Sequence, residues 1–205
     1  MEECAFCKEF RTGVIELKDI VLKRKVLHES KHFVVFPSLG QITEGYLLIV
    51  PKKHHLSIAS IPKTQFGELE KVVEKVKKVL AENYCSPIIF EHGCASETKR
   101  AGCCIDHAHL HAVPAKASIA GELARKFKSS KIKDYKSLAL AKKKPYFFVE
   151  EEGSKRLFQI PNAVPSQYIR KLLAFKIGEW LKWDWRVYLG IEELKATEKK
   201  LEGKF

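Results

Sequence analysis

The sequence lacks any apolar run that approaches the roughly 20 residues needed to cross a bilayer, so we expect no transmembrane helix and no membrane partner. The first twenty residues carry Glu2, Glu3 and Glu9 and have no apolar signal core, which argues against a secretory peptide. No internal repeat and no flexible linker divides the chain. We therefore expect a cytoplasmic protein, built as one enlarged domain or as an ordinary domain with an elaborate extension.

Acidic residues are too few to balance the basic ones. The 37 Lys and Arg residues exceed the 25 Asp and Glu residues, which gives a formal net charge of +12. Such a balance favours anionic partners such as nucleotides, nucleic acid or anionic lipid, although many cytosolic proteins are basic for solubility alone. The hydrophobic content of 45% suffices for a core, and the 30% of charged residues fits a soluble surface.

Three histidines recur at every second position: His107, His109 and His111. In an extended strand alternate side chains point to opposite faces, so these three would share one face. The positions between them are small and apolar: Ala108, Leu110 and Ala112. Three imidazoles on one face pack poorly because each needs hydrogen-bond partners. The row therefore indicates chemistry, and the alternative is a strand whose histidines are fortuitous.

The run His-x-His-x-His followed by two apolar residues resembles the histidine triad (HIT) family of nucleotide hydrolases and transferases. A second feature is similar to that family: Gly45 leads the apolar segment 46–50, and Pro51 and two further residues precede His54. The resemblance runs to about residue 115. It implies an α+β fold, in which a HIT-like catalytic domain over residues 1–115 has an antiparallel sheet and a covering helix. Apolar residues at helical spacing predict that helix over about 63–83.

About ninety residues follow the HIT-like part, and we expect them to form a C-terminal α/β extension, 116–205, packed on the core. The pattern predicts, in order, a short helix at 119–127, a hairpin at 145–160, a helix with Ser166 as N-cap, and a charged helix at 190–202. The segments Pro-Ser-Gln-Tyr-Ile-Arg and Trp-Asp-Trp-Arg are also similar to the C-terminal part of the CwfJ family, which is associated with RNA splicing and debranching.

Cys4 and Cys7 form a Cys-x-x-Cys pair whose spacing matches a tetrahedral zinc site. A redox pair is the alternative, but it would be expected between a strand and a helix. In metal-binding HIT proteins the remaining ligands are the histidine after the proline and the first triad histidine, which here are His54 and His107. His55 is a possible competitor for His54. Such a closed Cys₂His₂ set implies structural zinc, whereas free buried thiols would imply no metal.

The resemblance also implies the catalytic residues. His109, the middle histidine, would attack the α-phosphorus of a nucleotide and form a nucleotidyl-imidazole intermediate, which water then hydrolyses. His111 would contact the phosphate or the leaving group. Imidazole suits this task because its pKa of ~6.5 leaves much of it as free base at neutral pH. A nucleophilic imidazole also needs its other nitrogen held as N–H, usually by a backbone carbonyl.

The phosphate site would lie next to the triad. Gly102, Cys103 and Cys104 stand where the family has Gly-Gln-Ser/Thr. Gly102 would let the backbone approach the phosphate, and Cys104 would replace a hydroxyl donor by the weaker thiol. Lys99 and Arg100 lie in the preceding loop and would hang near the histidines.

Two further positions depart from the family. Glu91 stands where an Asn or Gln commonly lies near the phosphates, and its carboxylate would repel phosphate unless the basic loop or a proton offsets it. Alternatively, it would orient a catalytic histidine or a water. Ser38 replaces the Asp or Asn that binds ribose hydroxyls. These changes leave open whether the substrate is a dinucleoside polyphosphate, a nucleoside phosphoramidate or a nucleotide–sugar-like donor.

We therefore predict a HIT-type hydrolase or nucleotidyl transferase that cleaves phosphoanhydride or phosphoramidate bonds of nucleotides at the α-phosphate. One alternative is a nucleic-acid-binding or end-processing protein, suggested by the Lys-rich stretch 126–144 with Tyr135 and by Trp183 and Trp185. A solvated charged surface over packed aromatics explains the same residues. The other alternative is a nucleotide-binding module with a degenerate site. A homodimer is possible, because HIT proteins are often dimers, although the extension could cover the usual interface.

Overall fold

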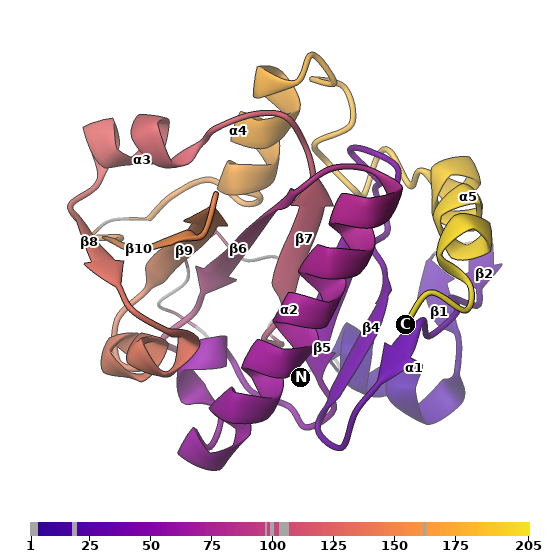
Figure 1. Cartoon of the computed structure of the whole chain (residues 1–205), viewed down its shortest axis with the longest axis horizontal. Helices are drawn as coiled ribbons and strands as arrows, with labels where there is room; N and C mark the ends of the chain where they lie inside the picture. Colours follow the sequence, from indigo (N-terminus) through magenta and orange to yellow (C-terminus); the bar gives the residue numbers. More distant parts are fainter. Residues whose placement is uncertain (1–3, 18–19, 97, 99–100, 103–106, 162) are drawn as a thin grey trace.

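A computed structural model describes residues 4–17, 20–96, 98, 101–102, 107–161 and 163–205 of the 205-residue chain. Its centre is an eight-stranded antiparallel sheet with the strand order β3-β4-β5-β7-β6-β9-β10-β8 (Figure 1). Its strands are β3 (His28–Glu29), β4 (Phe33–Pro37), β5 (Leu47–Pro51), β6 (Pro87–Gly93), β7 (Leu110–Pro114), β8 (Ser129–Ile132), β9 (Tyr146–Glu151) and β10 (Ser154–Gln159). A separate two-stranded ribbon pairs β1 (Ile15–Leu17) with β2 (Ile20–Leu22). The fold is therefore α+β, as predicted.

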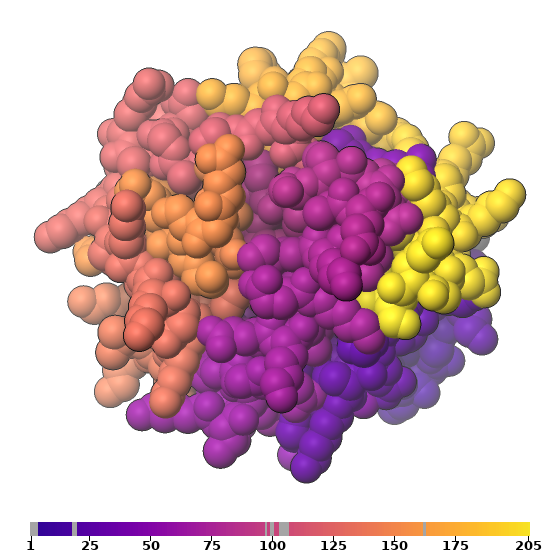
Figure 2. Space-filling model, viewed as in Figure 1, coloured from indigo at the N-terminus to yellow at the C-terminus, as the bar shows by residue number. Residues whose placement is uncertain are grey.

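One face of the sheet is covered by α2 (Phe66–Asn83), the covering helix that the periodicity predicted. Its buried residues are Phe66, Leu69, Val72, Val73, Val76, Val79 and Leu80. The same core includes sheet residues such as Val35, Ile49 and Leu110. In the space-filling view, the magenta surface of α2 fills the centre of this face, between the orange β9–β10 region and the yellow helix α5 (Ile191–Leu201) (Figure 2).

The opposite face of the sheet holds a second core, to which α1 (Ala5–Thr12), α3 (Ala120–Lys126) and α4 (Tyr168–Lys176) contribute. The buried side chains that these helices provide are Phe6, Leu123, Ile169, Leu173 and Ala174. They pack with Leu48, Phe90 and Phe147 of the strands. Because both faces are covered, the four strands β4, β5, β6 and β7 are buried along their whole length.

The triad segment follows the predicted alternation. Ala108, Leu110 and Ala112 belong to the core on the α2 side. His111 lies opposite Leu48 of β5 and Phe90 of β6, two residues of the other core. However, the hydrogen-bonded strand β7 begins only at Leu110, so His107 and His109 precede it.

The C-terminal residues extend the same sheet. β9 pairs with β6, with Ile89 opposite Glu150, and β10 and β8 follow outward. The hairpin predicted at 145–160 and the helices near 119–127 and 190–202 are present. The division into 1–115 and 116–205 stays a prediction, but the sheet is continuous across it.

One detail of the extension differs from the prediction. Helix α4 begins at Tyr168 with Gln167 as N-cap, so Ser166 is not the cap. The helix ends at Lys176, and Trp180 and Leu181 lie beyond it with exposed side chains. Among the described residues no helix is long and apolar enough to span a membrane.

Candidate functional site

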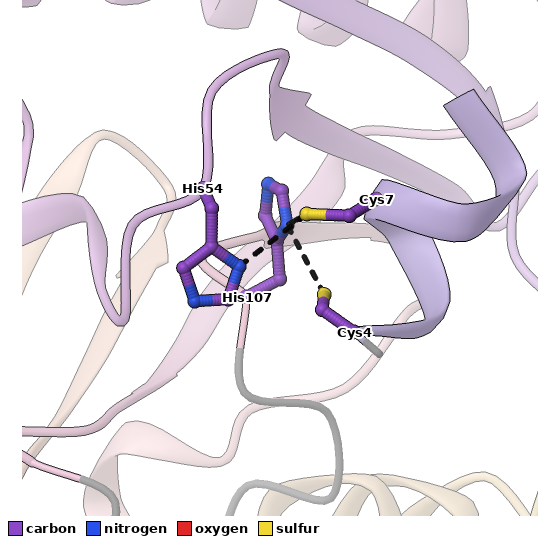
Figure 3. A group of neighbouring side chains, drawn as sticks. All are labelled: Cys4, Cys7, His54 and His107. Carbon is purple, nitrogen blue, oxygen red and sulfur yellow. Dashed lines mark hydrogen bonds between the residues drawn. The ribbon is translucent and has the colours of Figure 1, made fainter. Parts of the chain in front are cut away.

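The four predicted metal ligands converge. The ligand atoms of Cys4, Cys7, His54 and His107 all lie within 4.8 Å of one another, although they come from separate parts of the chain (Figure 3). Cys4 immediately precedes α1 and Cys7 lies within it, whereas His54 follows β5 and His107 precedes β7. The His107 Nδ1 atom lies 3.4 Å from Cys4 Sγ and 3.6 Å from Cys7 Sγ, and His54 Nδ1 lies 3.5 Å from Cys7 Sγ. This cluster could bind a metal ion.

A hydrogen bond fixes the tautomer of His107, one of these four residues. His107 Nε2 lies 2.8 Å from the carbonyl oxygen of Pro51, so Nε2 must carry the proton and donate it. That tautomer leaves a lone pair on Nδ1, the atom that faces the two thiols, as in metal-ligating histidines whose second nitrogen is fixed by a carbonyl. His54 joins the cluster and its neighbour His55 does not; the His55 backbone carbonyl instead accepts a hydrogen bond from the Ala108 N–H.

The middle triad histidine is held in a similar way. His109 Nδ1 lies 2.7 Å from the carbonyl oxygen of His107, which accepts the Nδ1 proton and leaves Nε2 as the basic nitrogen. Burial is the main reason that the pKa of His109 is lowered to about 4, and the positive charge of Arg170 adds to the lowering. The ring lies edge-on against His111, with 4.6 Å between centroids.

His111 is more deeply enclosed. Its ring stacks on Phe90 at 4.4 Å, and its Nδ1 is hydrogen-bonded to the Tyr46 hydroxyl at 2.6 Å. Burial holds the pKa of His111 well below its ordinary value. The imidazole is therefore neutral at physiological pH and has one nitrogen fixed by a buried tyrosine.

Both histidines line a cavity of about 290 Å³. Ser38 and Gly102, two of the predicted substrate residues, line the same cavity. The Ser38 hydroxyl donates to its neighbour's carbonyl, Leu39 O, at 2.8 Å. Gly102 has a φ of +67°, and a Cβ at this position would lie 2.4 Å from the Pro165 carbonyl oxygen. The absence of a side chain at Gly102 thus lets the C-terminal extension come close to the site. The predicted role of this glycine was different, namely a close approach of the backbone to phosphate.

The prediction that Glu91 lies near the phosphates or orients a catalytic histidine is wrong. Glu91 points to the α2 side of the sheet, opposite to its neighbours in β6, and is only 2% exposed. Its carboxylate accepts hydrogen bonds from the Ile58 N–H at 2.7 Å and the Tyr146 hydroxyl at 2.5 Å. Desolvation raises its pKa to about 7. The four other predicted substrate residues, Lys99, Arg100, Cys103 and Cys104, lie outside the described residues.

Several cavity residues were missed by the sequence reasoning: Arg24, His92, Gln167 and Arg170. The last two come from the extension, as does Trp185, which the sequence suggested only as a residue for nucleic-acid binding. His92 follows the period-2 rule, because it stands two residues after Phe90 on β6 and so faces the same side. Its Nε2 accepts a hydrogen bond from the Ile169 N–H at 3.1 Å.

The aromatic residues that suggested nucleic-acid binding are placed differently from one another. Tyr135 is 1% exposed, and its hydroxyl donates to the buried Glu150 carboxylate. It is therefore a core residue and is not available for stacking on a base. Trp183 packs at the edge of the second core beneath Lys171, and Trp185 lines the cavity.

Similar proteins are found both among known sequences and among solved structures. An uncharacterized HIT-like protein of Methanocaldococcus jannaschii is 27% identical over 115 residues, which cover 54% of this chain and 78% of that protein. An adenosine 5'-monophosphoramidase of Candida albicans is 28% identical over 120 residues, 58% of this chain and 74% of that protein. A solved histidine triad nucleotide-binding protein of Sulfolobus tokodaii is 21% identical with a TM-score of 0.44, covering 68% of this chain and 89% of that one.

The family model described as "Scavenger mRNA decapping enzyme C-term binding" matches residues 13–126, more than half of the chain. The match ends close to the point where the sequence resemblance ended. It includes the triad and His54 and leaves out most of the extension. The chain therefore belongs to the family of this model, and together with its HIT-like relatives the match shows that it is a histidine triad family protein.

Proposed function

We propose that this protein is a nucleotide hydrolase or nucleotidyl transferase in which His109 attacks the α-phosphorus of the substrate. One observation carries the proposal: the His109 Nδ1 proton is held by a backbone carbonyl, and the ring lines a cavity large enough for part of a nucleotide. Nε2 is therefore the nitrogen that can supply an electron pair. The arrangement is that of an activated nucleophile whose orientation is fixed by a second group.

The reaction would proceed in two steps. In the first, His109 Nε2 forms a bond to the α-phosphorus while the bond from phosphorus to the leaving oxygen or nitrogen breaks. In the second, water attacks the same phosphorus, the P–N bond breaks, and the nucleoside monophosphate leaves; in a transferase another acceptor replaces water. His111, whose orientation is fixed by Tyr46, lies beside His109 and would contact the phosphate or the leaving group.

We further propose that Cys4, Cys7, His54 and His107 hold a structural zinc ion. Two thiols and two imidazoles are the donor set that zinc prefers, and their number completes a tetrahedral shell without an open position. Bound there, zinc would supply folding energy and no reaction chemistry. It would tie α1 to the segment that carries His109, two residues beyond His107.

The test of the reaction is a His109→Asn variant assayed against a substrate panel. The panel holds a dinucleoside polyphosphate, a nucleoside phosphoramidate, a nucleotide sugar and, because the matched family model is described for an mRNA decapping enzyme, a cap dinucleotide. We expect the wild type to release a nucleoside monophosphate from at least one substrate. The variant should bind that substrate and lose turnover.

The matched control is His28→Asn, a histidine on β3 that stacks on Phe205 and does not line the cavity. It should keep wild-type turnover. With substrate labelled on the α-phosphate, the wild type should also yield an acid-labile phosphorylated protein, which the His109 variant should not. Full turnover by His109→Asn would refute the assignment of the nucleophile, and absence of turnover on the whole panel would favour a binding module.

A further inference from the structure

Arg170, on helix α4, is a buried cation that is held by backbone oxygens. The residue is 3% exposed. Its Nε donates to the Trp183 carbonyl at 3.0 Å, and its Nη2 donates to the Gly40 carbonyl at 2.7 Å and to the Lys182 carbonyl at 3.5 Å. These acceptors fix the plane of the guanidinium group, but none of them carries a full negative charge.

Within the described part of the chain no carboxylate pairs with Arg170, and besides the carbonyls its charge lies over the face of the Tyr46 ring, whose centroid is 5.1 Å from the guanidinium carbon. Arg24, the other arginine of the cavity wall, differs in this respect, because it forms a two-pronged ion pair with Glu9. A buried charge without a counter-charge is costly, since desolvation of an ion exceeds what neutral acceptors return. A buried charge in a cavity wall indicates a functional residue, and a guanidinium group is suited to the recognition of anions.

Arg170 lines the same cavity as His109 and His111. Its Nε and Nη2 are engaged by the carbonyls, whereas Nη1 has no hydrogen-bond partner among the residues that the structure describes. A guanidinium group matches the geometry of phosphate oxygens and binds them by charge-assisted hydrogen bonds.

We propose that Arg170 binds a phosphate group of the substrate in this cavity, so that the C-terminal extension completes the active site. The inference rests on the proposed function in assigning the anion to a nucleotide. It adds that a residue outside the segment matched by the family model, 13–126, belongs to the substrate site. Arg170 would neutralise the charge that repels an incoming phosphate from a buried pocket and would hold the phosphorus near His109.

Glycine at position 40 supports this arrangement. Gly40 has a φ of +66°, and a Cβ there would lie 2.8 Å from Arg170 Nη2 and 2.4 Å from the Cβ of Trp185. The Gly40 N–H also donates to the Leu189 carbonyl at 2.7 Å. The loop before β5 is thus fitted to the extension at the point where Arg170 is anchored.

The experiment measures the binding of inorganic phosphate to the full-length wild type and to Arg170→Gln, by changes in NMR chemical shifts, which report weak affinities. Because the variant loses a charge-assisted hydrogen bond to phosphate, we expect it to bind phosphate roughly 10- to 100-fold more weakly. The control is Arg156→Gln on β10, which removes the same charge from the extension outside the cavity wall. It should change phosphate affinity less than twofold.

A folded Arg170→Gln variant that binds phosphate like the wild type overturns the proposal. If that variant does not fold, a crystal structure of the wild type at saturating phosphate decides: a phosphate hydrogen-bonded to the Arg170 guanidinium supports the proposal, and a phosphate elsewhere or none overturns it. Because phosphate binding needs no turnover, these results are independent of the His109 test. If the wild type turns over substrate but Arg170→Gln binds phosphate as tightly as the wild type, only the role of Arg170 is refuted. If Arg170→Gln binds phosphate more weakly but the wild type turns over no substrate, only the proposed reaction is refuted.

Discussion

Replacing Glu91 by Gln should stabilise the protein at alkaline pH. Glu91 is 2% exposed, and its burial raises its pKa from an ordinary 4.5 to about 7. Between these two values the folded protein binds a proton that the unfolded chain has lost. The free energy of unfolding must therefore fall as the pH rises from about 4.5 to about 7. At 1.36 kcal/mol for each pH unit, this interval corresponds to about 3 kcal/mol.

The assay is urea unfolding of the wild type and Glu91→Gln from pH 5 to pH 9, at equal metal content. A glutamine is neutral at every pH and can still accept the hydrogen bond from the Ile58 N–H. We expect the two proteins to be similarly stable at pH 5, and the variant to be more stable by up to about 3 kcal/mol at pH 8. Titration of the buried histidines affects both proteins equally and cancels in the difference.

Glu82→Gln on the exposed surface of α2 is the control, and it should change stability by less than about 0.5 kcal/mol at any pH. A difference between wild type and Glu91→Gln that stays constant from pH 5 to pH 9 would refute the reasoning, because it would mean that the buried carboxyl does not titrate in this range. Glu91→Gln should also keep the activity of the wild type. The partners of Glu91 belong to the core on the α2 side, whereas Phe6, which His109 contacts, belongs to the core on the other side of the sheet.

Two further substitutions test the metal cluster and the junction between core and extension. Cys7→Ser should reduce bound zinc, measured by elemental analysis, from about one ion per chain to none and should destabilise the protein by several kcal/mol. The control is Cys85→Ser, which removes a free thiol outside the cluster and should leave the zinc content unchanged. Zinc that is retained in Cys7→Ser would exclude this ligand set. Gly102→Ala should lower the free energy of unfolding, measured by chemical unfolding, by about 1–3 kcal/mol, because its Cβ would meet the Pro165 carbonyl. In the control Gly121→Ala on α3, the Cβ meets no atom within 4 Å, so this variant should be as stable as the wild type or slightly more stable. Equal effects of the two substitutions would contradict this account.

Local periodicity predicted the parts of the fold that are set by neighbours in sequence. The apolar run before Pro51 forms the buried strand β5, and helical spacing of apolar residues gives α2. The metal cluster was predictable only in part from local signals: the Cys-x-x-Cys spacing indicated Cys4 and Cys7, whereas His54 and His107 were added because the chain resembles metal-binding HIT proteins. The similarity of the extension to the CwfJ family stays a prediction, as do nucleic-acid binding and a homodimer.

The prediction for Glu91 was wrong because the two-residue alternation of strand faces was applied to the triad segment and not to the neighbouring strand β6. Alternation was used to place the triad histidines, but the same period of two on β6 puts Glu91 on the face opposite to Phe90 and His92. In the structure Phe90 lies across from His111, which fixes the face of every residue in β6. Resemblance to a family position suggested a phosphate contact, and the parity of the strand excludes it.

The extension's role in the site was harder to foresee because it depends on contacts between distant residues. The hydrogen bond from Arg170 to the Gly40 carbonyl joins residues 130 positions apart, and that from the Ile169 N–H to His92 joins residues 77 apart. One local signal was nevertheless present. Ile169, Leu173 and Ala174 form the buried face of α4, and Arg170 lies among them, so a charge interrupts an apolar stripe that should repeat at helical spacing. Arginine is seldom buried without an anion. An arginine on the inner face of a helix therefore predicts a nearby anion before the distant partner strands are known, and here that reasoning leads to the cavity of His109.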